Sequence, residues 1–448
     1  MNRLLLFCAL PLLAQTKAID PQIKKIVDEI SEVRIAAHMQ KLESFGTRNT
    51  FTEPPDPGKG TKAARAWLLA ELKSYSTRLD AHFDTHHVKK FGDRFFRDAD
   101  VVNLIAVLPG KTDPARQIIV SAHYDTISLV RKPGTVSGEG NVDGEKSAAQ
   151  MLAPGVVDNG SGTAAVLELA RVLSQYEYDA TLVFILFDAE EYGLVGANAY
   201  ATRARKENQR IEAVFNNDII GSDTTGDGRT ENRRVNLYSE DPLDSPSRNL
   251  ARYIKEVAER YVPSMKVDLV FRHDRFARGG DHTQFNYEGF AAVRFTSAAE
   301  FFAHQHNATD TLAFAAPGYT AHVAKLNAAA LANLALAPKA PLVTRTVVSS
   351  GRQTANIARG KSGYAAVMHW KNETPEADLA GYKILMRSTL APMWEREIFV
   401  GKVEQYALEG VNIDDLILAV QAVDNAGHEG LAAAYVAAPA PKVHLETQ

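Results

Sequence analysis

Short apolar runs alternate with helical patterns over the first three quarters of the chain. Several runs lack polar alternation, which is typical of strands that are covered on both faces. Between them, 161–176 has the clearest helical spacing of apolar residues. The runs that predict strands are 101–108, 117–123, 181–187, 213–220 and 290–295. This alternation predicts an α/β domain with a mixed, largely parallel central sheet that is flanked by helices.

Two other parts of the chain have a different pattern of apolar and polar residues. Residues from about 20 to 90 are expected to be helical with loops, with a helix at 61–75. A helix from 326 runs into the Pro-containing segment 337–341, which is interpreted as a linker. Short strand-like runs with Gly, Asn, Asp and Pro between them follow, and they predict an all-β sandwich. We therefore expect one domain at 19–338 and a second at 342–448.

The first 18 residues have the pattern of a secretory signal peptide. Arg3 precedes an apolar stretch at 4–13, which is too short to span a bilayer. Cleavage is expected after Ala14 or Ala18, and the alternative is an N-terminal amphipathic helix. The single cysteine, Cys8, lies in this segment, so the mature chain is expected to contain no disulfide and no reactive thiol. These features predict a secreted or periplasmic protein.

Composition and charge exclude several classes of partner. The chain is 45% hydrophobic, which is enough for a large core. Its length of 448 residues predicts two or three domains. The net charge of -4 gives no reason to expect binding to nucleic acid or to an anionic membrane. No other run is long and apolar enough to be expected to span a membrane. The oligomeric state is not encoded in any pattern that we recognise.

Three carboxylates crowd the end of one apolar run. In "FILFDAEE" the run ends in Asp188, Glu190 and Glu191. Like charges that are buried so close together repel unless a positive group compensates them. A solvated acidic loop would also explain the pattern if it stood alone.

Other predicted strand ends also carry candidate metal ligands. His123 ends one run with Asp125 two residues on, and Asp218 ends another. In an open α/β sheet, sites form at the carboxyl ends of the strands. Each residue alone has an ordinary explanation, such as a core histidine, a helix cap or a turn. The remaining candidates are Asp158 at a Gly-rich turn before a helix, and His304 and His306 beyond the last run.

Together, two histidines and three carboxylates form a mixed nitrogen and oxygen set that suits zinc or a similar divalent ion. One shared carboxylate, with one histidine and one further carboxylate for each ion, gives a paired site. Paired ions are a known solution for aminopeptidase chemistry.

The order of motifs carries a family resemblance. Five motifs follow one another along the chain: H-x-D, D-N-G-S-G, E-E, N-x-D and H-x-x-x-D. Two further motifs are "FGTR" at 45 and "GGDH" at 279. Over about residues 40–335 the chain resembles the dizinc aminopeptidases of metallopeptidase clan MH, of the secreted bacterial leucyl-aminopeptidase type. The resemblance implies the zinc-exopeptidase fold and two Zn²⁺ ions, with other divalent metals as alternatives. In the C-terminal part, "VMHW" and "GYKILMR" resemble a fibronectin type III-like domain, with Trp370 and Tyr382 as core aromatics.

The resemblance also implies a role for each site residue. His123 binds one ion, Asp158 bridges both, and His306 completes the second ion. Glu191 and Asp218 are terminal ligands on different ions. Glu190 is the general base, and Asp125 orients His123 as metal-bound imidazoles usually require. A non-proline cis peptide is implied between Asp158 and Asn159.

The sequence departs from the family pattern in four places. The Gly-rich insertion at 129–152 is expected to form a lid or rim over the site. Gln305 stands where some relatives have a tyrosine that helps stabilise the oxyanion. Asn159 replaces an aspartate that many relatives have. His304 is the reserve choice for the last ligand, but Asp310 has the family's spacing from His306.

The implied substrates are peptides with a free N-terminus, whose α-amine would lie near one metal and an acidic side chain. A glutaminyl cyclase with one zinc, and a carboxypeptidase or dipeptidase on the same scaffold, are alternative enzymes. A catalytically dead binding protein, like the transferrin receptor ectodomain, is the alternative without activity. The full two-metal set favours the aminopeptidase.

Overall fold

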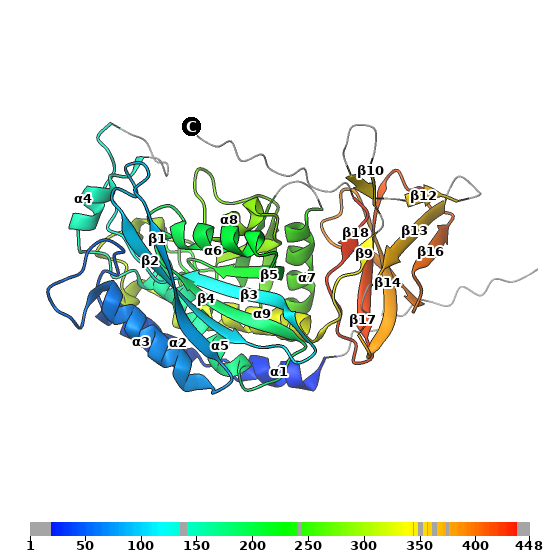
Figure 1. Ribbon diagram of the computed structural model, residues 1–448, viewed down its shortest axis with the longest axis horizontal. Coiled ribbons are helices and arrows are strands. Elements are labelled where there is room, and N and C mark those ends of the chain that lie inside the picture. The colour runs from blue at the N-terminus through cyan, green and yellow to red at the C-terminus, as the bar shows by residue number, and fades with distance from the viewer. Residues whose placement is uncertain are drawn as a thin grey trace, which may run out of the picture.

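The computed structural model describes most of the chain beyond the predicted signal peptide, which lies outside the described residues. The described ranges are 19–134, 141–240, 244–343, 345–347, 353–355, 357–360, 365–372 and 376–436. Two bodies are evident: a large α/β unit and a smaller unit of strands at the C-terminal end (Figure 1).

An eight-stranded sheet is the centre of the α/β unit. Its strand order is β1-β2-β4-β3-β5-β8-β6-β7. The pairs β3–β4, β3–β5, β5–β8 and β6–β7 are parallel, and β1–β2, β2–β4 and β6–β8 are antiparallel. The mixed, largely parallel sheet predicted from the sequence is thus confirmed. The strands are β1 (Asp80–Val88), β2 (Ala99–Leu108), β3 (Asp113–His123), β4 (Ala180–Phe187), β5 (Arg210–Asn217), β6 (Arg234–Ser239), β7 (Lys266–Val270) and β8 (Ala292–Ser297).

Helices cover both faces of this sheet, as predicted. The shared apolar core of one face includes α1, α2, α3, α5, α7 and α9, and α9 contacts four of the other helices (Figure 1). Ala197, Tyr200 and Phe285 of α6 and α8 pack on the opposite face. The helices are α1 (Pro21–Asp28), α2 (Glu32–Ser44), α3 (Gly60–Tyr75), α4 (Gly144–Ala149), α5 (Ser161–Leu173), α6 (Val195–Lys206), α7 (Pro246–Tyr261), α8 (His282–Tyr287) and α9 (Pro317–Leu336), with short turns η2 (Val156–Gly160), η3 (Phe302–His304) and η4 (Leu312–Phe314).

Strand register places the candidate ligands at one edge. His123 is paired with Phe187 across β3 and β4, and Asn217 is paired with Phe295 across β5 and β8. The carboxyl ends of four neighbouring strands therefore lie level, and the residues that follow them meet.

Four elements differ from the expectations or were not expected. The segment 80–88, expected to be helical or loop, is strand β1, which pairs antiparallel with β2 at the sheet edge. Its sequence is mostly polar and only Ala81 is buried, so no apolar run marked it. Strands β6 and β7 and helix α7 were also absent from the predictions. Both strands are short, five or six residues long.

The C-terminal unit is all β. One of its two larger sheets has the order β12-β13-β16 with β9 also paired to β13, the other has the order β15-β14-β17-β18, and β10 and β11 form a separate pair. Apolar residues of both sheets form one cluster, in which Trp370 lies edge-on to Tyr382 at 5.5 Å, as predicted for this pair. The all-β sandwich is thus confirmed, and its likeness to fibronectin type III stays a prediction. The strands are β9 (Leu342–Val343), β10 (Arg345–Val347), β11 (Gln353–Ala355), β12 (Ile357–Arg359), β13 (Ala365–Lys371), β14 (Leu379–Ser388), β15 (Arg396–Gly401), β16 (Gln405–Glu409), β17 (Leu416–Asp424) and β18 (Ala433–Ala434).

Buried charges join the two units. Asp244, just before α7, forms ion pairs with Arg252 of α7 and with Arg387 of β14. All three side chains are almost fully buried. Arg260 of α7 pairs with Glu429 at 2.9 Å. We call Asp244, Arg252 and Arg387 the junction cluster.

We find no described helix that combines the length and the apolar character needed to cross a bilayer.

Candidate metal centre

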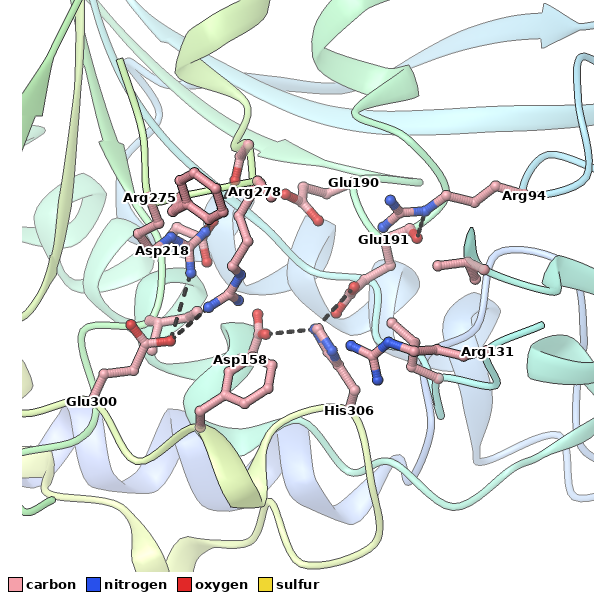
Figure 2. Close-up of a pocket in the computed structure, with 17 residues that line it drawn as sticks. Arg94, Arg131, Asp158, Glu190, Glu191, Asp218, Arg275, Arg278, Glu300 and His306 are labelled. Atoms are coloured by element: carbon pink, nitrogen blue, oxygen red, sulfur yellow. Dashed lines mark hydrogen bonds and ion pairs between the residues drawn. The ribbon is translucent and has the colours of Figure 1, made fainter. Parts of the chain in front are cut away.

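Five segments deliver their side chains to one buried point at the carboxyl edge of the sheet, and Figure 2 shows the members from four of them, Asp158, Glu190, Glu191, Asp218 and His306. His123 is the last residue of β3, and Asp218 directly follows β5. The other members are Asp158 from η2, Glu190 and Glu191 after β4, and His306 after η3. We call these six residues the metal cluster. All but His306 are at most 9% exposed.

The ligand atoms fall into two sets that share Asp158. His123 Nε2 lies 3.3 Å from Asp158 Oδ1 and 3.5 Å from Asp218 Oδ1. His306 Nε2 lies 3.0 Å from Asp158 Oδ2 and 3.3 Å from Glu191 Oε2. Ligands around a tetrahedral zinc ion at its usual bond lengths are about 3.4 Å apart. In each set the histidine nitrogen thus lies at ligand spacing from two carboxylates, with one oxygen of Asp158 beside each histidine. The groups of three whose ligand atoms all lie within 4.8 Å of one another are His123, Asp158 and Glu191, and His123, Glu190 and Asp218.

Unpartnered atoms face the same point. His123 Nε2, Glu191 Oε1 and Asp218 Oδ1 are buried and have no hydrogen-bond partner within the described chain. Buried polar atoms are rarely left without a partner. Three of them together, with nitrogen and carboxylate chemistry, fit divalent cations of the zinc type.

The pKa values of the two glutamates agree with a deficit of positive charge in the metal cluster. Burial raises the pKa of Glu191 well above its usual range, and the Asp158 and Glu190 carboxylates raise it further. Burial, with Asp218 and Asp158, also raises the pKa of Glu190 to about 8, against the opposing effect of His123. Bound cations reverse this effect, because they favour the ionised carboxylates.

The three carboxylates of the strand-end stretch have different surroundings. Asp188 accepts hydrogen bonds from Thr50 Oγ1 at 2.9 Å, from the Val102 amide at 3.1 Å and from the Ala189 amide at 2.8 Å. It therefore has donors of its own and does not belong to the metal cluster. Glu190 and Glu191 line the cavity instead.

Asp125 holds several parts of the site in place. Its carboxylate lies 3.4 Å from His123 Nδ1, on the side of the ring away from the cluster. The same carboxylate accepts hydrogen bonds from the Glu190 and Glu191 amides at 3.1 and 3.2 Å. The position agrees with the predicted orienting role, and the contacts to the two amides were not foreseen.

The Gly-rich turn lets Asp158 reach the cluster. Gly155 has φ of +59°, and a Cβ there would lie 2.1 Å from Thr126 Cγ2. A Cβ at Gly162 would lie 2.2 Å from the Asn217 carbonyl oxygen. Any larger residue at either position would separate the start of α5 from the strand ends. The Asp158–Asn159 peptide bond is cis, which confirms that prediction.

Three non-glycine residues of the site have left-handed backbone conformations. Ala189, Ile219 and His306 have φ between +57° and +59°. Such residues are uncommon and cluster where a site over-determines the backbone. Their positions, beside Glu190 and Asp218 and at His306 itself, agree with a functional edge.

Three charged residues support the cluster through contacts that sequence reasoning did not foresee, although Asp310 and the motif of Arg48 had been noted. Arg294, fully buried in β8, lies 3.0 Å from Asp218 Oδ2. A charge inside the apolar run at 290–295 was the signal that could have found it. Asp310 accepts the Val157 and Asp158 amides at 2.7 and 2.9 Å, and burial raises its pKa to about 7. Arg48, in the "FGTR" motif, donates to the Tyr124, Pro154 and Gly155 carbonyls, which ties three loops of the site together.

His304 and Gln305, which precede His306, have contacts outside the metal cluster. His304 Nδ1 lies 2.8 Å from Thr309 Oγ1, and its ring stacks on Phe314 at 3.9 Å. The geometry therefore favours His306 over His304 as the ligand. Gln305 accepts from Arg278 and donates to Glu300, so its amide is already engaged.

A cavity of about 480 Å³ opens over the cluster. Its size is in the range of pockets that hold small ligands. Leu129, Arg131 and Val142, from the predicted rim insertion at 129–152, form part of its wall. The other lining residues outside the cluster are Arg94, Ile219, Arg275, Phe276, Ala277, Arg278, Gly279, Glu300 and Phe302.

Known proteins share this sequence and fold. A "probable zinc metalloprotease" of Pyrenophora tritici-repentis is 32% identical over 92% of this chain and 86% of its own length. One of Pyricularia oryzae is 33% identical over 92% and 83%.

Solved structures below 25% identity support the fold. The LapA aminopeptidase of Legionella pneumophila has a TM-score of 0.52 and 20% identity over 70% of this chain and 76% of its own. A glutaminyl cyclase of Porphyromonas gingivalis has a TM-score of 0.51 and 18% identity over 67% and 97%.

The sequence profile described as "Peptidase family M28" matches residues 103–331, which is the part of the chain that carries the whole metal cluster and the strands that position it. On this match and on the long alignments to the fungal proteins, the chain belongs to peptidase family M28.

Proposed function

We propose that this protein is a zinc-dependent aminopeptidase that removes the first residue from peptides. The observation that carries the proposal is the division of the cluster into two ligand sets that share Asp158. His123, Asp158 and Asp218 would hold one Zn²⁺, and Asp158, Glu191 and His306 would hold the other. Relatives described as probable zinc metalloproteases support zinc as the ion.

When bound, the ions supply Lewis acidity, which makes hydroxide available from water near neutral pH and polarises the scissile carbonyl. Glu190 lines the cavity beside both ligand sets. This position suits a general base, which needs access to the substrate and to the attacking water. Glu190 would accept the proton of the attacking water and transfer it to the leaving amine.

Other residues would hold the acid–base machinery in position. Asp125 fixes the two glutamate amides and faces the far nitrogen of His123. Arg294 neutralises the outer oxygen of Asp218. Such outer contacts orient metal ligands and tune the ions.

Two features outside the site complete the proposal. The N-terminal signal pattern supports secretion or export to a periplasm. The C-terminal sandwich supports a docking or stabilising role of the fibronectin type III-like kind, since no member of the metal cluster lies in it.

Metal analysis and substrate profiling test this function. The purified protein should contain two zinc ions per chain, and it should hydrolyse aminoacyl-arylamides with a free α-amine. The N-acetylated forms of the same arylamides should not be cleaved. Release of C-terminal residues, or conversion of N-terminal glutamine to pyroglutamate with one bound zinc, would replace the proposal by one of its alternatives.

A further inference from the structure

Two arginines on one wall of the cavity have donors to spare. Arg131 is exposed and forms no ion pair or side-chain hydrogen bond with other described residues. Arg94 donates through Nε to the Glu191 carbonyl at 2.8 Å, and its two Nη groups make no hydrogen bond within the described chain. Both point into the cavity beside His306 and Glu191 (Figure 2).

The opposite wall differs in this respect. Arg278 pairs with Glu300 at 2.9 Å and Arg275 approaches the same carboxylate at 3.6 Å. Arg275 also pairs with Asp274 at 3.0 Å and donates to the Gly279 carbonyl at 3.0 Å. These two guanidinium groups are thus already neutralised by the protein, as the dashed contacts in Figure 2 show.

Acidic residues near Arg94 and Arg131 do not neutralise them. Asp93 pairs with Lys132, and Asp143 pairs with Lys146 at 2.8 Å. Both of these carboxylates thus have a lysine partner, and no described carboxylate forms an ion pair with Arg94 or Arg131, so the positive charge of the two arginines is available to a ligand.

Arg131 is held where it is by backbone contacts. It forms a bridge with Val142, and the Asp143 amide donates to the Val130 carbonyl at 2.9 Å. The Leu129 amide donates to the carbonyl of His306 at 3.1 Å. The segment that carries Arg131 is thus bonded directly to a proposed metal ligand. This bond sets the backbone of Arg131 at a fixed place relative to the metal cluster.

We infer that Arg131, with Arg94 behind it, binds a carboxylate of the substrate while the scissile bond lies over the metal cluster. A guanidinium fork matches a carboxylate in shape and charge. In a cavity of about 480 Å³, the carboxylate within reach is the C-terminal one of a short peptide. The substrate class is therefore di- and tripeptides with a free C-terminus. This inference rests on the proposed function, because it names the substrate of the same site.

A carboxylate on the substrate's first side chain has the same chemistry, and the experiment separates the two sources. The zinc-loaded protein is assayed with a leucyl dipeptide as the free acid and as its C-terminal amide, which keeps the bond to be cleaved and removes the charge. Glutamyl- and glutaminyl-arylamides form the second pair.

The readout is the ratio of kcat/KM values within each pair, so that general damage to a variant cancels. The wild type should prefer the free acid by about tenfold or more, the range of a charged hydrogen bond. Arg131→Gln should abolish the preference, Arg131→Lys should restore part of it, and added salt should weaken it. Arg205→Gln, an exposed arginine of α6 outside the cavity lining, is the matched control and should keep it.

Each remaining outcome decides the question. A preference for glutamyl over glutaminyl arylamide that depends on Arg131, with acid and amide peptides equal, assigns the carboxylate to the side chain. Equal rates within both pairs, or a preference that Arg131→Gln leaves unchanged, overturn the inference while the aminopeptidase stands.

If no peptide is hydrolysed, the proposed function fails and binding still tests the inference. Titration calorimetry of the same peptide acid and amide with the zinc-loaded protein should show tighter binding of the acid, and Arg131→Gln should remove the difference. Equal binding of acid and amide would overturn the inference in that case also.

Discussion

The metal cluster and the junction cluster both bury several charges, but they meet the problem of burial in opposite ways. At the junction, Asp244 lies between two guanidinium groups, so positive charge is in excess. Those groups also donate to backbone carbonyls, including Pro392 at 2.7 Å from Arg252 and Ala391 at 2.9 Å from Arg387. Backbone carbonyls can satisfy an excess of buried cations in place.

At the metal cluster the excess is negative, because four carboxylates converge on the ring nitrogens of two histidines. Three buried ligand atoms have no partner within the described chain. Amides support the outer sides of the carboxylates but do not reach the centre. The comparison teaches that burial of charge alone does not identify a site. What distinguishes the site is a set of carboxylates that converge on two histidine nitrogens and leave several buried candidate ligand atoms without a partner in the described chain.

The largest expected effect concerns Glu190. Glu190→Gln keeps the size of the side chain but removes the base, so kcat should fall by about 10²-fold or more while both metals stay bound. Glu191→Gln should instead lower metal occupancy, with activity partly restored by added zinc. Metal content and turnover at saturating zinc check both variants. Metal loss in Glu190→Gln with full loading of an inactive Glu191→Gln would reverse the two roles.

Next in size is the loss of the junction carboxylate. Asp244→Asn leaves two buried guanidinium groups without a counter-charge, and this should lower the free energy of unfolding by about 3–5 kcal/mol. Zinc content and kcat of the folded protein should not change, because no member of the junction cluster lines the cavity. The control is Asp113→Asn, which breaks the more exposed Asp113–Arg210 pair and should cost at most about 1 kcal/mol. Equal destabilisation by both variants would show that the junction cluster does not join the units.

Removal of the metals should have a smaller effect on stability. Ions that bind only the folded chain stabilise it by about 2.7 kcal/mol at a concentration 100 times the Kd. Chelation should lower the unfolding free energy by an amount of this order, and zinc should restore it. The Asp244→Asn penalty should be the same with and without zinc, because distant sites are additive. An unfolding free energy that does not respond to chelator would contradict the assignment of the cluster.

The smallest expected effect is a pH dependence at the junction. Burial lowers the pKa of His428, but its contacts with Asp424 and Asp20 outweigh burial and raise the pKa above its usual value. The charged histidine therefore stabilises the fold below about pH 6.5, and this contribution is lost as the pH rises through the folded pKa. His428→Gln should remove that component of the pH dependence. Thermal unfolding of the wild type and the variant between pH 6 and pH 9 measures it, and identical profiles would refute it.

The centre of the fold and the members of the cluster could be predicted because their signals are local. A buried parallel strand is an apolar run, and a polar site residue at its end interrupts that run, as His123 does. Strand β1 could not be predicted in this way. It lies at an edge with one neighbour, so its sequence stays polar.

The contacts of the supporting charges could not be predicted, because the two partners of each contact are distant in the chain. Asp218 meets Arg294, and Asp158 meets Asp310 through its amide. Neither spacing follows a helical or strand period. The insertion at 129–152 was recognised by its length, whereas the significance of Arg131 depends on which neighbouring acids already have lysine partners.

Asp125 has a consequence for how this enzyme can be altered. One carboxylate holds the amides of two adjacent residues, the proposed base and a proposed ligand, and also faces His123. A substitution there would shift metal affinity and proton transfer together, so neither property can be engineered through this position without the other. Adaptation of the centre to another metal would instead have to begin at Arg294 or Asp310, each of which supports a single ligand.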